Sequence, residues 1–203
     1  MTISKTLINQ HAFNYRDFRN LMKELIRGNE NNYTEQYKDW LTYIEKNDKL
    51  MDRLEKHVTL NKSLSKFIGN KAESWTWLVI AEPWCGDVGQ NLPVLNAIAE
   101  ASPAITMKII LRDQHPEVMD QYLTNGARSV PVLVCLKASD LKELGRWGPR
   151  PEPAQKIMEK HKYQNDPPEK KDAIKKVQLW YEKDNQNTIQ EELEELIWQW
   201  ANH

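Results

Sequence analysis

The chain has 203 residues, 28% of them charged and 40% hydrophobic, and its formal net charge at pH 7 is −1. So small a net charge argues against nucleic-acid-binding proteins and against proteins that bind anionic membranes, because both classes need an excess of basic residues. No apolar run approaches the ~20 residues of a membrane-spanning helix, and residues 1–18 lack an apolar core of signal-peptide length, so we expect a cytoplasmic protein without a membrane or nucleic-acid partner.

Residues 1–73 are predicted to form an extension of amphipathic helices. Apolar side chains recur at helical spacing over residues 18–26, 33–44, 50–58 and 64–68. Asn32 and Glu35 fit a capping box at the start of the second stretch. Each stretch has one apolar face, which another part of the protein must cover. Since no linker rich in proline, glycine or serine follows, we expect the extension to pack on the domain after it.

Residues 74–163 are predicted to combine strands and helices. Continuous apolar runs at 75–81 and 106–111 predict two buried strands, and residues 88–101 between them predict a helix bent at Pro93. A strand, a helix and a second strand in this order predict a parallel strand pair. A helix is expected to start at Pro116, a third strand to cover residues 130–136, and residues 141–147 to form its antiparallel hairpin partner.

Residues 164–203 are predicted to form C-terminal helices. Thr188 and Glu191 have the residue types and the spacing of a capping box before the last helix. Ile189 and Trp200 belong to its apolar stripe, whereas Trp198 points to the opposite side. A large aromatic residue on that side either serves a dimer or other partner contact, or is covered by another segment of the chain.

Cys85 lies where the first buried strand passes into the helix that follows. The unpaired amides of the first helical turn and the helix macrodipole both favour the thiolate, which is the nucleophilic form of cysteine. Asp87 acts in the opposite direction, because a nearby negative charge disfavours ionisation of the thiol. The position therefore makes Cys85 a candidate reactive residue.

The stretch Trp84-Cys85-Gly86-Asp87-Val88 resembles the active-site turn of the thioredoxin superfamily, where Trp-Cys-Gly-x-Cys occupies the same strand–helix junction. Pro93 matches the proline that kinks the following helix in that family. Ser129-Val130-Pro131 matches the start of its cis-proline strand. The whole turn is most similar to a bacterial branch of thioredoxin-like proteins in which the second cysteine is variable.

This resemblance implies an α/β fold: a thioredoxin-like domain over residues 74–163 with a central mixed sheet flanked by helices, a helical extension over 1–73, and C-terminal helices over 164–203. It also implies that Cys85 is the catalytic position in a substrate groove made of Trp84, Gly86, Asp87, Val88, Val130 and Pro131. Cys135 follows Pro131 by about 13 Å of strand, whereas bridged Cα atoms lie within about 7 Å of each other. Cys135 is therefore expected to be a buried residue that does not pair with Cys85.

Two departures from the family pattern leave two functional hypotheses. Val88 stands in place of the second cysteine, and Val79 in place of the buried acid that accepts a proton. The first hypothesis is a monothiol thiol–disulfide oxidoreductase that acts through Cys85 on a protein or small thiol or disulfide substrate, with an outside thiol resolving the mixed disulfide. The alternative is a non-catalytic module of the thioredoxin fold that binds a protein or peptide. The five histidines are scattered, and none pairs with a cysteine at metal-ligand spacing, so no metal or other cofactor is expected.

Overall fold

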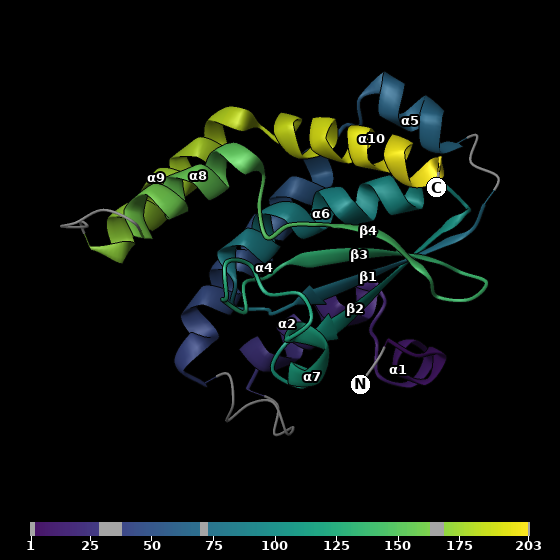
Figure 1. Ribbon diagram of the computed structural model, residues 1–203. Helices are drawn as coiled ribbons and strands as arrows, with labels where there is room; N and C mark the ends of the chain where they lie inside the picture. Colours follow the sequence, from purple (N-terminus) through teal and green to yellow (C-terminus); the bar gives the residue numbers. More distant parts are fainter. Residues whose placement is uncertain (1–2, 29–37, 70–72, 163–168, 203) are drawn as a thin grey trace.

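The computed structural model describes residues 3–28, 38–69, 73–162 and 169–202. Within them, a four-stranded sheet has the order β2-β1-β3-β4 (Figure 1). β1 pairs in parallel with β2, and β3 pairs antiparallel with both β1 and β4. The predicted α/β fold with a mixed central sheet is confirmed. The strands are β1 (Trp75–Ala81), β2 (Ile105–Leu111), β3 (Val132–Lys137) and β4 (Glu143–Trp147).

The central strand β1 explains why the sheet is covered on both faces. Every residue of β1 is buried, including Trp75 and Trp77. An antiparallel sheet with one wet face would alternate apolar and polar residues, whereas a strand buried on both sides is apolar throughout. Helices must therefore cover both faces, and Trp200 from the C-terminal helix meets Trp75 and Trp77 edge-on, with ring centroids 6.2 and 6.5 Å away.

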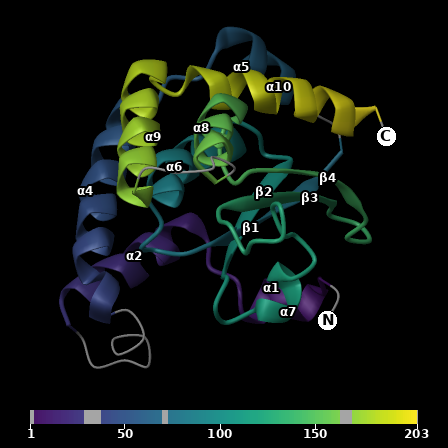
Figure 2. The same ribbon diagram turned by 60° about the vertical axis from the view of Figure 1, so that its left-hand side comes forward.

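Helices lie on both sides of the sheet and along one end of it. In Figures 1 and 2, α6 and α10 lie on one side and α1, α2 and α7 on the other, while α4 runs along the flank. α4 packs on both α2 and α6, and α8 packs on α9. The helices are α1 (Lys5–Gln10), α2 (Tyr15–Ile26), α4 (Leu41–His57), α5 (Lys62–Gly69), α6 (Gly86–Glu100), α7 (Pro116–Met119), α8 (Glu152–Lys162), α9 (Lys170–Asp184) and α10 (Asn187–Ala201), with a 3₁₀ turn η1 (Lys38–Trp40) before α4.

The helix α4 joins the N-terminal helices to the sheet domain. On one side its Asp48, Asp52 and Glu55 surround the buried guanidinium of Arg19 from α2, at 2.7, 2.7 and 2.6 Å. On the other side its Asn47 donates a buried hydrogen bond of 2.9 Å to the carbonyl of Pro83, just before Cys85. Helix α4 thus reaches the candidate site directly.

The structure differs from the sequence-based prediction in several helices, and α1 was not predicted. Residues 41–57 form one continuous helix where two stretches, 33–44 and 50–58, were predicted; the predicted capping box at Asn32 lies outside the described residues. The capping box at Thr188 is wrong. Gln186 occupies the N-cap in a left-handed conformation without a side-chain cap, and the Thr188 hydroxyl donates backwards to Asp184. Among the described helices, none is at once long and apolar enough to cross a membrane.

Candidate functional site

Cys85 is the N-cap residue of α6. Its backbone is extended, with φ −78° and ψ 122°, and its carbonyl accepts from the amide of Gly89 at 3.1 Å, which begins the helix. The Cys85 amide donates to the carbonyl of Glu82 at 3.1 Å, which closes the turn after β1. The side chain of Glu82 is fully buried and accepts from the amide of Asp113 at 2.9 Å. This hydrogen bond connects the segments that follow β1 and β2.

The structure brings Cys85 next to the segment that precedes β3. The Cys85 thiol donates to the carbonyl of Val130 at 3.2 Å, across 45 residues of sequence. The Val130–Pro131 peptide bond is cis. Gly148 holds the next loop against the same segment: its φ is +116°, and a Cβ there would lie 2.3 Å from the carbonyl oxygen of Pro131. The Val130–Pro131 segment therefore lies between the Cys85 turn on one side and the Gly148 loop on the other.

Burial keeps the Cys85 thiol protonated. It raises the pKa of Cys85 to about 12, and the negative charge of Asp87 adds to the rise. The amides of Val88 and Asp87 and the guanidinium of Arg150 lower the pKa, as expected at a helix N-terminus, but they do not outweigh burial. A protonated thiol is also what the hydrogen bond to Val130 requires, since only S–H can donate.

The Asp87 carboxylate belongs to a buried polar network. It accepts from Arg150 Nε at 3.0 Å and from the Tyr181 hydroxyl at 3.0 Å. The Tyr181 oxygen in turn accepts from Asn91 Nδ2 at 2.8 Å, and Arg150 Nη1 donates to Gln155 at 2.7 Å. The side chains of Asp87 and Arg150 are each only 13% exposed. The network binds α6 to α8, to α9 and to the loop before α8, and it gives Asp87 a structural partner.

Trp84 is covered by residues from two other segments. The Trp40 ring stacks on it, with centroids 4.8 Å apart and planes at 25°. The guanidinium carbon of Arg112 lies 4.7 Å from the Trp84 ring centroid, a cation–π geometry. Arg112 also donates to the carbonyl of Arg128 at 3.1 Å, close to Val130 in sequence. An aromatic and basic cluster of Trp40, Trp84 and Arg112 therefore adjoins the Cys85 turn.

The predicted groove residues occupy different depths. Gly86 is exposed, Trp84 and Cys85 are half-buried, and Val130 and Pro131 are buried. Val88, at the position of the family's second cysteine, is 1% exposed and packs in the core, so it offers nothing to a ligand. Cys135 is buried in β3 and forms no disulfide with Cys85.

Several residues of this site were missed by the sequence-based prediction. These are Trp40 of η1, Arg112 immediately after β2, Arg150 in the loop before α8 and Tyr181 of α9. The only local signal was the sequence Gly148-Pro149-Arg150-Pro151, because an arginine between two prolines stands in a restricted backbone. Its partner could not be identified from the sequence. In the part of the chain that the structure describes, no three His, Cys, Asp or Glu residues are arranged to hold a metal ion.

Comparisons with known proteins concern the family and the fold. A family model described as "Thioredoxin" matches residues 31–164. The crystal structure of a protein of unknown function from Pseudomonas aeruginosa superimposes with a TM-score of 0.61 at 16% sequence identity, covering 97% of this chain and 98% of that one, which shows a shared fold. An HIV epitope-scaffold crystal structure gives a TM-score of 0.46 at 20% identity, over 70% of this chain and 81% of that one. No curated protein matches the chain.

Proposed function

We propose, from the premise that this chain belongs to the thioredoxin family, that it is a non-catalytic binding module which holds an extended segment of a protein partner beside Cys85. The observation that carries the proposal is the 3.2 Å hydrogen bond from the Cys85 thiol to the Val130 carbonyl. It makes the cysteine a protonated donor that fixes the loop before β3. A thiol used in this way positions a binding surface, whereas a redox nucleophile must be a thiolate.

The residues around Cys85 also lack the machinery of turnover. The second cysteine is replaced by the buried Val88, so no neighbouring thiol can resolve a mixed disulfide. Asp87 accepts hydrogen bonds from Arg150 and Tyr181, so its carboxylate is already occupied and is not free to act as a base. These contacts stabilise the turn.

Backbone and aromatic groups supply the contacts that a peptide needs. Among the described residues, no acceptor takes the Val130 amide, so this N–H can donate to an added strand. Next to the turn, Trp40 and Tyr43 are 41% and 53% exposed, with ring centroids 5.7 Å apart. Aromatic side chains of this kind are enriched in protein interfaces. The proposed partner is therefore an extended peptide with an apolar or aromatic anchor residue.

The proposal is tested by selecting peptides from a display library against the whole chain and mapping the strongest binder by NMR. We expect the peptide to shift the amides of Val130 and Gly86 and the indole signal of Trp40. Binding should weaken about tenfold or more in Trp40→Ala, as for an interface hot spot. It should be retained in Cys85→Ser, because the serine hydroxyl can still donate to the Val130 carbonyl. Trp198→Ala is the matched control, because this tryptophan is 60% exposed on α10. Shifts confined to other surfaces, or binding that needs a disulfide with Cys85, would contradict the proposal.

A monothiol oxidoreductase is the second candidate, and one observation favours it. The amides of Asp87 and Val88 and the guanidinium of Arg150 all act to lower the pKa of Cys85. A substrate that displaced the Val130 carbonyl could use these groups to stabilise a thiolate, which would attack a disulfide and release one sulfur as a thiolate. An outside thiol would then free Cys85. The test is reduction of insulin by dithiothreitol: this candidate requires the wild-type chain to accelerate the reaction over Cys85→Ser, and equal rates reject it.

A further inference from the structure

Helix α4 carries a polar side chain in the middle of its buried face. The buried residues of this helix are Ile44, Asn47 and Met51, and Asn47 is only 6% exposed. Burying a carboxamide costs free energy unless it is hydrogen-bonded, so packing alone would favour a leucine, which has nearly the same shape. The asparagine therefore indicates a polar contact that this position has to supply.

That contact is made with the turn that carries Cys85. Asn47 Nδ2 donates to the carbonyl of Pro83 at 2.9 Å. Pro83 is buried, and in the described part of the chain no backbone amide donates to its carbonyl. The bond also fixes the orientation of the carboxamide, because a carbonyl oxygen can only accept. Asn47 thus satisfies a buried acceptor that the backbone of the turn leaves open.

The same side chain packs against the other side of the turn. Gly89 lies in the first turn of α6 and donates its amide to the Cys85 carbonyl at 3.1 Å. A Cβ at Gly89 would lie 3.1 Å from Asn47 Oδ1 and 3.2 Å from Asn47 Cγ, so a larger residue would displace the carboxamide. Asn47 therefore contacts the chain on both sides of Cys85, at Pro83 before it and at Gly89 after it.

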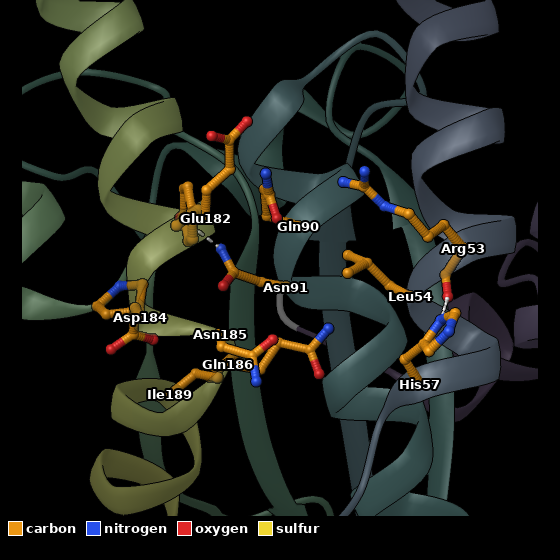
Figure 3. Close-up of a pocket in the computed structure, with 12 residues that line it drawn as sticks. Arg53, Leu54, His57, Gln90, Asn91, Glu182, Asp184, Asn185, Gln186 and Ile189 are labelled. Atoms are coloured by element: carbon orange, nitrogen blue, oxygen red, sulfur yellow. Dashed lines mark hydrogen bonds between the residues drawn. The ribbon is translucent and has the colours of Figure 1, made fainter.

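The contact with Asn47 is made at the N-terminal end of α6. Further along, side chains of the two helices line a pocket of about 520 Å³, with Arg53 on α4 and Gln90 on α6 (Figure 3). The turn from α9 to α10 also lines this pocket. The direct packing of α4 on Gly89 thus lies next to Cys85, the N-cap residue of α6.

We propose that Asn47 is a positioning residue for Cys85, which holds the turn so that the thiol stays against the Val130 carbonyl at 3.2 Å. This role rests on the proposed function, in which Cys85 is a protonated donor that fixes the loop before β3. Without the bond from Asn47 the turn moves and admits water to the sulfur. Since burial is the largest cause of the raised pKa of Cys85, water at the sulfur favours the thiolate. Helix α4 thereby controls the reactivity of the cysteine.

The test is the initial rate at which the native chain reacts with a chromogenic disulfide at about pH 8, corrected by the rate of Cys85→Ser. Asn47→Leu removes the donor and keeps the shape of the side chain. We expect its rate to rise about threefold or more, because tenfold more thiolate outweighs the lower nucleophilicity of that thiolate. The charged groups that act on the sulfur, Asp87 and Arg150, are the same in both proteins, so the change reports the burial of the sulfur.

Asp48→Ala is the matched control on the same helix. Asp48 accepts from the guanidinium of Arg19 at 2.7 Å and contacts α2, on the other side of α4 from the Cys85 turn. This variant should unfold at a lower urea concentration but react at the wild-type rate. Circular dichroism checks folding, and Asn47→Ala, which needs no additional space, carries the same expectation if the leucine variant does not fold.

Two outcomes overturn the proposal: a wild-type rate in the Asn47 variant, or an equal rise in Asp48→Ala, which would make the effect one of general destabilisation. The proposed function fails on a different result. It is contradicted if the wild type itself shows a thiol midpoint at or below about pH 8.5, whatever the variants do.

Discussion

The protonated state of Cys85 is the property on which the proposed binding module depends, and it can be measured. With a pKa of about 12 in the folded protein and about 8.5 in an unfolded chain, the thiolate fraction at pH 8 is about one in ten thousand folded and about one quarter unfolded. The thiolate fraction of the unfolded chain is therefore roughly 2,000 times that of the folded protein. A thiol of higher pKa is intrinsically more nucleophilic, by about fortyfold across this interval for a Brønsted coefficient of about 0.45. The lower thiolate fraction outweighs the higher nucleophilicity, so Cys85 in the folded protein should react about fiftyfold more slowly than in the unfolded chain.

The assay is the initial rate of reaction with a chromogenic disulfide as a function of pH, for the native chain and for the chain in urea. Cys85→Ser measures the contribution of Cys135, which is fully buried when the protein is folded. We expect the native rate to rise steadily through about pH 10 with no plateau, whereas the unfolded chain levels off above its pKa of about 8.5. A native plateau with a midpoint at or below about 8.5 would refute the reasoning and favour the monothiol oxidoreductase.

Three further outcomes follow from particular contacts. Arg150→Gln leaves the buried carboxylate of Asp87 without its cation and should lower the free energy of unfolding by about 3 kcal/mol, measured in urea; a loss of under about 1 kcal/mol would mean that the pair contributes little. Gly145→Ala places a Cβ 2.1 Å from Trp200 Nε1 and should cost about 1–3 kcal/mol, with tryptophan fluorescence reporting the displaced ring; unchanged stability would contradict the packing of α10. The pKa of Cys85 is higher in the folded than in the unfolded protein, so its contribution to stability is present below about pH 8.5 and is lost as the pH rises. The wild type should therefore lose more stability than Cys85→Ser between about pH 8 and about pH 10. Equal losses in the two proteins would exclude the pKa shift.

Helix α4 has a physical role that its helical periodicity does not reveal. Its Asn47 donates to the carbonyl of Pro83 in the turn before Cys85. In the chain, α4 comes directly after η1, whose Trp40 stacks on Trp84. The prediction divided α4 into two helices because residues 45–49 are all polar. Two of them are polar for a structural reason: Asn47 bonds the Pro83 carbonyl, and Asp48 holds Arg19.

The sequence by itself determined the local framework of the site. The run at 75–81, apolar except for Thr76, required a strand covered on both faces, and the tight turn after it placed Cys85 at a helix N-terminus. The parallel pairing of β1 with β2 followed from the helix between them. These features depend on residues close together in the chain, whose spacing and polarity already contain the information.

Only the tertiary structure decided the chemistry of that cysteine. The protonation state depends on how deeply the sulfur is buried and on the carbonyl of Val130, 45 residues further along the chain. Asp87, which in sequence is only a nearby negative charge, acquires partners 63 and 94 residues away in Arg150 and Tyr181. Desolvation and hydrogen bonding act over a few ångströms in space, so they depend on which segments meet, and sequence periodicity carries no record of that.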